Sequence, residues 1–431
     1  MRWLCVAAPS RVAVSSLVAL HLRALAPPPL GALPGIGYLR PAGAGPVPAL
    51  LCAAMNHLLL FAAAVGGALL TAAAPARAQV DSVRAKTLPG KQVAEKAYNA
   101  GLSSFNGRSY EAALRSFDAA IAAKPDFAPA YANRAATRFE LKNYAQAAQD
   151  YTQALKLEPG AYASYFGRGQ ALEADGKLAE AEADYAEALR ANPTYGPAWY
   201  NRGVIRFERA EFQAARDDFD GAVKADPSYA YAYHDRASAN LKLSNFAEAV
   251  RDYSKALELQ PKLLPALLNR AAAERRTGQL PQALKDYDAY LDQKADNALA
   301  FNNRGSARFE NKDYAGAVAD FNQALLLDPT YAYAWNNRAA AELKLERYDK
   351  AQADADQALK LNPKYAEAYL NRGHAREMLR RPDEACQDWR QAAALGIDAG
   401  NSYAAAAGCA GEAVETPAAE APEKQLETDK K

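Results

Sequence analysis

The chain has 431 residues, 50% of them hydrophobic, and a formal net charge of +1. This hydrophobic content is enough for a large core and excludes wholesale disorder. The near-neutral charge argues against a nucleic-acid-binding protein, which usually carries a basic surface, and four cysteines are too few for a fold built on disulfides.

The first part of the chain has the pattern of a targeting segment. Residues 1–54 are rich in Ala, Pro, Gly and Arg and show no sustained periodicity. Met55 then precedes a short apolar run, and Ala76-Arg77-Ala78 places small residues where a signal peptidase needs them. We therefore expect a signal peptide over residues 55–78, cleaved between Ala78 and Gln79.

Two points about this segment stay open. If Met55 is the true start, residues 1–54 are an unstructured upstream over-call of the start site; the alternative start is Met1. Residues 50–74 are nearly all apolar, so an uncleaved membrane anchor is the alternative to a cleaved signal.

A polar linker is predicted over residues 79–93, and a regular array follows over residues 94–397. The array repeats every 34 residues, and we number the positions of each repeat from 1, with Gly196 as position 1 of the fourth repeat. The sixth repeat has Ala295 at position 32, and seven of the nine repeats have proline there: Pro125, Pro159, Pro193, Pro227, Pro261, Pro329 and Pro363. Each repeat reads as two amphipathic helices, A and B, separated by a turn, and the proline ends helix B.

Small and aromatic residues recur where two helices would meet. Position 8 is Gly or Ala and position 20 is Ala in all nine repeats. Position 24 is aromatic in eight of them: Phe117, Tyr151, Tyr185, Phe219, Tyr253, Tyr287, Phe321 and Trp389. Helices approach closely only where small side chains meet, so we expect these aromatic rings to fill the core beside them.

This 34-residue pattern resembles the tetratricopeptide repeat, in a protein of the exported bacterial type. The resemblance implies an all-α solenoid, a right-handed superhelix of about nine helix-turn-helix repeats. A segment over residues 398–413 is expected to be a capping helix that covers the last repeat. Residues 414–431 lack periodicity and are expected to form a disordered tail.

Two charged positions recur as regularly as the core. Position 7 is Arg and position 23 is Asp in repeats two to nine, and the first repeat has neither. Pairing within a repeat leaves no orphan charge at either end of the array, whereas pairing between repeats would leave one. We therefore predict eight ion pairs within repeats, with a role in the scaffold, because charges beside a core persist only when they are matched.

The resemblance also implies that the A helices line a concave groove into which position 6 points. Asparagine occupies that position in seven repeats, and its amide could bond to the backbone of an extended peptide. The candidate peptide-binding residues are these asparagines and nearby aromatic side chains: Asn99, Asn133, Asn201, Asn269, Asn303, Asn337, Asn371, Tyr200, Phe207 and Phe309. The alternative is that the asparagines merely solvate the groove, since exposed polar residues need no function.

The sequence shows no motif of a catalytic, phosphate-binding or metal-binding site. The sequence has no nucleophile elbow, no phosphate-binding glycine loop and no zinc-ligand spacing, so we expect no enzymatic activity, no cofactor and no metal. Cys386 and Cys409 would be the two cysteines of the mature chain, and an oxidising compartment would join them in a disulfide that fastens the cap.

We therefore expect a non-catalytic scaffold, periplasmic or secreted, that binds protein or peptide partners in its groove. Nucleic acid is not expected as a partner, and the mature form should have no stable membrane span. Two alternatives remain: a cell-envelope assembly factor that uses the edges of the array, and a repeat-bearing enzyme.

Overall fold

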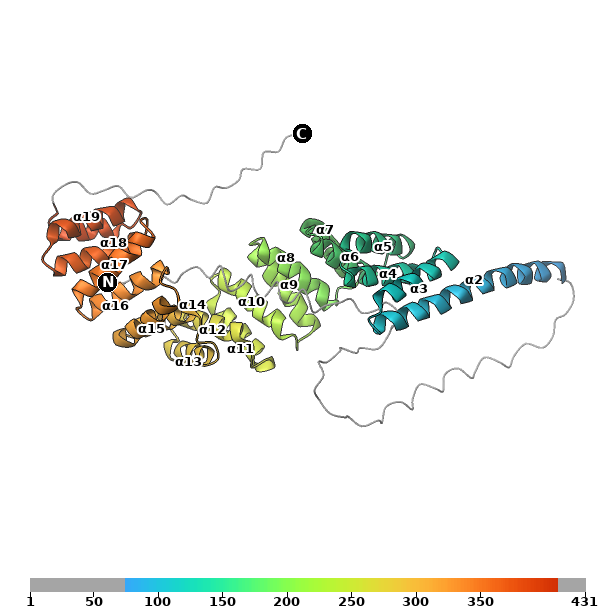
Figure 1. Ribbon diagram of the computed structural model, residues 1–431, viewed down its shortest axis with the longest axis horizontal. Coiled ribbons are helices and arrows are strands. Elements are labelled where there is room, and N and C mark those ends of the chain that lie inside the picture. The colour runs from blue at the N-terminus through green and yellow to red at the C-terminus, as the bar shows by residue number, and fades with distance from the viewer. Residues whose placement is uncertain (1–73, 410–431) are drawn as a thin grey trace, which may run out of the picture. The chain divides into compact units, whose positions relative to one another are not determined.

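The computed structural model describes residues 74–409, with side chains from residue 90 onward. The described residues form nineteen helices and no strand, which confirms the predicted all-α solenoid of nine repeats (Figure 1). The A helices are α2 (Ala74–Asn106), α4 (Ala128–Glu140), α6 (Tyr162–Ala174), α8 (Gly196–Glu208), α10 (Ala230–Lys242), α12 (Leu264–Arg276), α14 (Ala298–Glu310), α16 (Ala332–Lys344) and α18 (Ala366–Met378). The B helices are α3 (Tyr110–Ala123), α5 (Tyr144–Leu157), α7 (Leu178–Ala191), α9 (Phe212–Ala225), α11 (Phe246–Leu259), α13 (Leu280–Leu291), α15 (Tyr314–Leu327), α17 (Tyr348–Leu361) and α19 (Pro382–Ala394).

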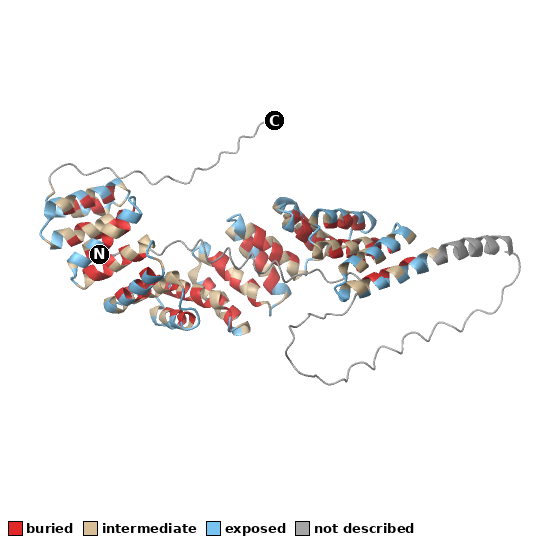
Figure 2. Cartoon of the chain, viewed as in Figure 1, coloured by how far each residue is buried: buried red, intermediate tan, exposed pale blue. Residues whose placement is uncertain are grey.

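The described chain divides into two compact units. The first ends at Pro193 and contains α2 to α7, which are repeats one to three. The second begins at Thr194 and contains α8 to α19, which are repeats four to nine, and a short last helix, α20 (Ala399–Ala406). Within each unit, an A helix packs along the B helix of its own repeat, and that B helix packs against the next A helix. Buried residues line the facing sides of these helices (Figure 2).

The predicted packing of small against aromatic positions is confirmed. Every aromatic ring at position 24 is buried. A Cβ atom added to Gly305 would lie 2.7 Å from the ring of Phe321, and one added to Gly203 would lie 2.8 Å from that of Phe219. Positions 8 and 24 therefore set how closely the two helices of a repeat approach each other.

The turn between helices A and B has the same backbone in all nine repeats. Position 15 has a positive φ throughout, yet only Gly176 and Gly278 are glycines there. In the seventh repeat, Lys312 has a φ of 65°, and the amides of Lys312 and Asp313 donate to the carbonyls of Phe309 and Arg308 at 3.0 and 2.8 Å. This is the Schellman pattern, which closes a helix by satisfying its last carbonyl groups.

Two predicted boundaries differ from the structure. Residues 79–93 were expected to be a linker, but they lie inside α2, which is 33 residues long. Their Gln, Arg, Lys and Ala residues favour a helix as readily as a solvated linker. The cap was expected over residues 398–413, and α20 ends earlier, at Ala406, because Gly408 has a φ of 69° and closes the helix. The signal peptide lies outside the described residues except for 74–78, which begin α2, and residues 1–54 and 414–431 lie wholly outside them.

The ion pairs predicted within repeats are confirmed in all eight. In each, the arginine Nε and Nη2 donate to the two oxygens of the aspartate: Arg134–Asp150, Arg168–Asp184, Arg202–Asp218, Arg236–Asp252, Arg270–Asp286, Arg304–Asp320, Arg338–Asp354 and Arg372–Asp388. This bidentate geometry is the strongest form of an arginine–carboxylate contact.

The same arginines also contact the preceding repeat and an aromatic ring, and neither contact was predicted from the sequence. In seven of the eight pairs, Nη1 donates to a side chain at position 25 of the preceding repeat, as from Arg304 to Asp288 at 2.7 Å and from Arg338 to Asn322 at 2.7 Å. In all but one of the eight repeats the guanidinium also lies over an aromatic ring at position 4 of its own repeat, 4.6 Å from the ring of Trp335 in the case of Arg338. Each of the seven arginines that donate to the preceding repeat therefore joins two B helices to the A helix between them.

Position 11 decides whether the buried aspartate has a second cation. In the seventh repeat, Arg308 Nη1 lies 2.9 Å from Asp320. In the eighth, position 11 is Glu342, and Arg338 is the cation that contacts Asp354. Burial raises the pKa of Asp354 above its ordinary value, and the hydrogen bond and charge of Arg338 oppose that shift.

This difference predicts unequal costs for two matched substitutions. Arg338→Ala should lower the free energy of unfolding by about 3–5 kcal/mol, because it leaves the Asp354 carboxylate buried and unpaired. Arg304→Ala should cost clearly less, because Arg308 still contacts Asp320. Both variants also lose a ring contact and a bond to the preceding repeat, which for Arg304 is an ion pair to the exposed Asp288 and for Arg338 is a hydrogen bond to Asn322. Urea unfolding at pH 7 measures both, and equal losses would contradict the role given to position 11.

Candidate protein-interaction surface

The asparagines predicted to line the groove do not share one environment. Asn99 is exposed, and Asn269 and Asn303 are half-buried. The other four are buried, with exposed fractions of at most 5%: Asn133, Asn201, Asn337 and Asn371. The expectation that position 6 faces solvent throughout is therefore wrong for these four residues.

The physical reason is the close approach of successive A helices, which brings position 6 against position 5 of the preceding repeat. Asn133 donates to the Tyr98 hydroxyl at 2.9 Å. Asn337 donates to Asn302 Oδ1 at 2.9 Å, and Asn371 donates to Asn336 Oδ1 at 2.8 Å. These amides hold neighbouring repeats together, and an amide already bonded inside the core is not available to a peptide.

The aromatic candidates also differ from the expectation. Tyr200 and Phe309 are buried, with exposed fractions of 5% and 6%, so neither offers surface to a partner. Tyr200 donates its hydroxyl to Asp235 at 2.7 Å, and Asp235 holds position 6 of the fifth repeat. Phe207 is half-buried and packs edge-on against Phe212.

The partners of these bonds were not among the residues predicted from the sequence. Position 5 supplies them, as Tyr98, Tyr200, Asn302 and Asn336, and each lies 35 residues before its partner. The signal was present as polar residues at positions 5 and 6 of successive repeats. Burial raises the pKa of the Tyr98 phenol to about 12, and the hydrogen bond from Asn133 opposes that shift.

What remains accessible on the A helices of the second unit is a smaller set. Positions 2 and 6 lie one turn apart on the same side of a helix. The half-buried residues there include Tyr231, Asn269, Asn303 and Tyr333, and Phe207 at position 12 is half-buried as well. We call these five residues the accessible A-helix surface.

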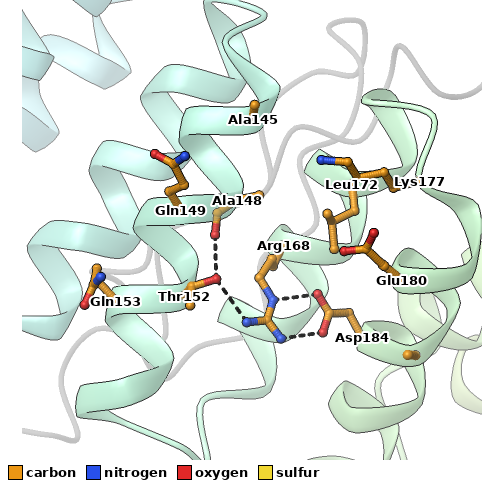
Figure 3. Close-up of a pocket in the computed structure, with 11 residues that line it drawn as sticks. Ala145, Ala148, Gln149, Thr152, Gln153, Arg168, Leu172, Lys177, Glu180 and Asp184 are labelled. Carbon is orange, nitrogen blue, oxygen red and sulfur yellow. Dashed lines mark hydrogen bonds and ion pairs between the residues drawn. The ribbon is translucent and has the colours of Figure 1, made fainter.

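A second surface lies on the side of the B helices. In the first unit, a cavity of about 570 Å³ opens between α5 and α7, with α6 at its floor (Figure 3). Arg168 lies at this floor and donates to Asp184 on one side and to Thr152 on the other. The walls carry the small side chains of Ala145, Ala148 and Ala183. The α5 side is also lined by the amides of Gln149 and Gln153.

The equivalent cavity between α9 and α11 in the second unit is smaller, about 370 Å³. Charged side chains line it, and they pair with one another: Arg216 with Asp217 at 2.8 Å and Arg251 with Glu248 at 2.9 Å. The cavity beside Arg168 is therefore wider because alanines replace paired charges on its walls.

No metal centre is found in the part of the chain that the structure describes, where no group of three or more His, Cys, Asp or Glu side chains is placed to hold an ion. Among the described helices, none combines the length and the apolar character that a membrane crossing requires.

Four models of one family match the chain, all described as the tetratricopeptide repeat. Their matches cover residues 133–196, 182–230, 230–263, 298–331, 332–365 and 355–387. The chain belongs to the tetratricopeptide repeat family. Arrays of this family serve as scaffolds for protein–protein interaction, and that is the general role of this chain. A search of curated proteins finds no match.

Several solved structures are similar to the chain. YrrB, described as a tetratricopeptide repeat protein with an unusual peptide-binding site, is 20% identical, with coverage of 43% of this chain and 95% of that one and a TM-score of 0.39. The C-terminal part of a repeat-containing protein from Cytophaga hutchinsonii is 20% identical, with coverage of 56% and 98% and a TM-score of 0.47. Yeast Tom70 is 14% identical, with coverage of 74% and 96% and a TM-score of 0.38.

One buried carboxyl group in the second unit is only partly satisfied by hydrogen bonds and opposite charges. Glu274, on α12, is 6% exposed, and its Oε2 atom has no hydrogen-bond partner in the described residues. Arg270 Nε lies 3.8 Å from its other oxygen. Burial, and then the charge of Asp286, raises the pKa of Glu274 to about 7, with Arg270 opposing the shift.

This shift predicts that Glu274→Gln stabilises the protein in a pH-dependent way. The pKa of Glu274 is higher in the folded than in the unfolded chain, so its ionisation destabilises the fold as pH rises between about 4.5 and 7. The variant should gain nothing near pH 4.5 and on the order of 2–3 kcal/mol above pH 7. Denaturant unfolding across this range measures the gain.

Glu342→Gln is the matched control. Glu342 also holds position 11 and is buried, but its carboxylate lies 3.2 Å from Arg347. Its replacement should give no gain at neutral pH, because the ion pair is lost. A Glu274→Gln effect of the same size at every pH would refute the assignment to ionisation.

Proposed function

We propose that this tetratricopeptide repeat protein is an exported, non-catalytic scaffold that binds a protein or peptide partner across the accessible A-helix surface. The observation that carries the proposal is the contrast within position 6. Four amides are buried, whereas Asn269 and Asn303 in consecutive repeats keep part of their surface accessible. An amide of this kind can both donate to and accept from a peptide backbone.

The neighbouring aromatic residues support a groove with apolar contacts. Tyr231 and Tyr333 are half-buried one turn before position 6 of their helices, and their rings pack edge-on against Tyr229 and Tyr365. Rings held in this way offer contact area without losing much conformational freedom on binding. An extended segment would therefore be held by a sum of amide bonds and ring contacts.

Double substitutions on the two surfaces test this assignment. Asn269→Ala with Asn303→Ala should weaken the binding of a partner, first identified by crosslinking in the native compartment and then purified, by about tenfold, because two backbone bonds are lost. Gln149→Ala with Gln153→Ala removes two amides from the cavity beside Arg168 and is the control.

Titration calorimetry on the purified partner separates the outcomes. Binding that is weakened by the glutamine pair and not by the asparagine pair would move recognition to the B-helix side. That result would favour the alternative, an envelope assembly factor that uses another surface of the array.

Export is the second part of the proposal. It rests on the apolar run and the Ala76-Arg77-Ala78 site in the sequence, and on the placement of Cys386 and Cys409, whose Cα atoms lie 5.7 Å apart in a disulfide. Such a bond persists in an oxidising compartment, which fits a periplasmic or secreted protein.

Analysis of the N-terminus of the exported protein tests this part. The mature chain should begin at Gln79 and should show no free thiol under native conditions. An N-terminus at Met1 or Met55, or two titratable thiols, would contradict export with cleavage.

A further inference from the structure

The short last helix is the beginning of a tenth repeat. Position 1 of that repeat is Gly400, 34 residues after Ala366, and α20 begins at Ala399. Tyr403 then holds position 4, which is aromatic in seven of the nine repeats, and Ala404 holds position 5. The helix therefore continues the array in register and is not an unrelated addition.

This tenth A helix stops halfway. Helix A is 13 residues long in repeats two to nine, whereas α20 has 8 residues and is closed by Gly408. Cys409 falls at position 10, where every earlier repeat from the second onward places a buried residue: Thr137, Ala171, Ile205, Ala239, Ala273, Ala307, Ala341 and Ala375. The disulfide between Cys409 and Cys386 thus lies at the position where a complete A helix would pack a buried side chain.

The half helix covers a specific apolar face of the ninth repeat. The ring of Tyr403 lies 4.4 Å from that of His374 and 6.0 Å from that of Trp389. Gly400 lies directly on the α19 backbone, where an added Cβ atom would collide with the Trp389 carbonyl. Under this cover, Trp389 is 1% exposed.

Beyond α20, the exposed residues of the ninth repeat are mixed in character. Glu377 and Pro382, at positions 12 and 17, are exposed, and Met378 is 51% exposed. A stacked array leaves an apolar face at its end, and α20 occupies the part of that face formed by His374 and Trp389.

We propose that α20 is a cap latched by the Cys386–Cys409 disulfide, and that a dithiol reductant releases it and opens the end of the ninth repeat to a helix of the same pattern. In this step the dithiol supplies two electrons and two protons, is itself oxidised to a disulfide, and leaves two protein thiols. An isolated helix of this length is marginal in water, and α20 buries only Gly400 and Ala404 fully, so its packing depends on the covalent bond. The helix that fits the open face has an aromatic residue at its fourth position and small residues at its first and fifth.

Hydrogen exchange on the full mature chain tests the latch. Reduction with dithiothreitol should speed amide exchange in residues 399–409 by on the order of a hundredfold, while α17 changes only a few-fold. Burial, and then the charge of Lys344, lowers the pKa of His374 to about 4, so release of Tyr403 should move that pKa towards its ordinary value. A variant with Cys386→Ser and Cys409→Ser should exchange rapidly with and without the reductant.

A synthetic peptide tests the opened face. A peptide of residues 396–409 with Cys409→Ser should bind the reduced protein and the double-serine variant but not the oxidised protein. Slow exchange of residues 399–409 after reduction would overturn the latch, because packing alone would then hold the cap. Amide exchange that accelerates as much in α17 and α19 as in residues 399–409 would also overturn the latch. The disulfide would then stabilise the whole end of the array. Failure of the peptide to bind any form would overturn the docking face.

Discussion

The structure depends on one half-buried arginine that recurs at position 7. Its guanidinium binds the aspartate of the same repeat through two nitrogens, and in most repeats it uses the third for the preceding B helix. Its planar face lies on an aromatic ring in all but one of these repeats. Lysine could not replace it, because a point charge provides neither the paired bonds nor the flat face.

Such a pair is costly to take out of water, so it specifies geometry more than it stabilises the fold. Burial raises the pKa of Asp320 and Asp354 in spite of their arginines. The cost of removing these carboxylates from water therefore exceeds the stabilisation of their charge by the arginines. The pairs therefore fix the distance and angle between helices, and the alanines and rings of positions 8, 20 and 24 supply the apolar contact. A repeat that loses its arginine or its aspartate still has the desolvation cost of the remaining charge, but no longer has the ion pair that offsets it.

The same closeness between repeats decides which polar residues can serve a partner. Tyr98, Asn302 and Asn336 each offer an acceptor at position 5. The asparagine at position 6 of the following repeat is then buried and donates its amide to that acceptor. Where position 5 is Leu268, the following Asn303 remains partly accessible. The binding surface that we propose is therefore the part of the polar column that keeps accessible surface.

The sequence by itself determined the period, the helix pairs, the aromatic core and the pairing of Arg with Asp, because each follows from residue types that recur every 34 residues. It also placed Cys386 near Cys409. Only the tertiary structure decided that Asn337 is buried while Asn303 is half-buried, that Tyr200 donates to Asp235, and that seven of the eight arginines also contact the preceding repeat. These facts depend on the distance between neighbouring A helices, and that distance is set jointly by side chains 35 residues apart. A pattern within one repeat cannot reveal whether a polar group that recurs faithfully faces water or the next helix.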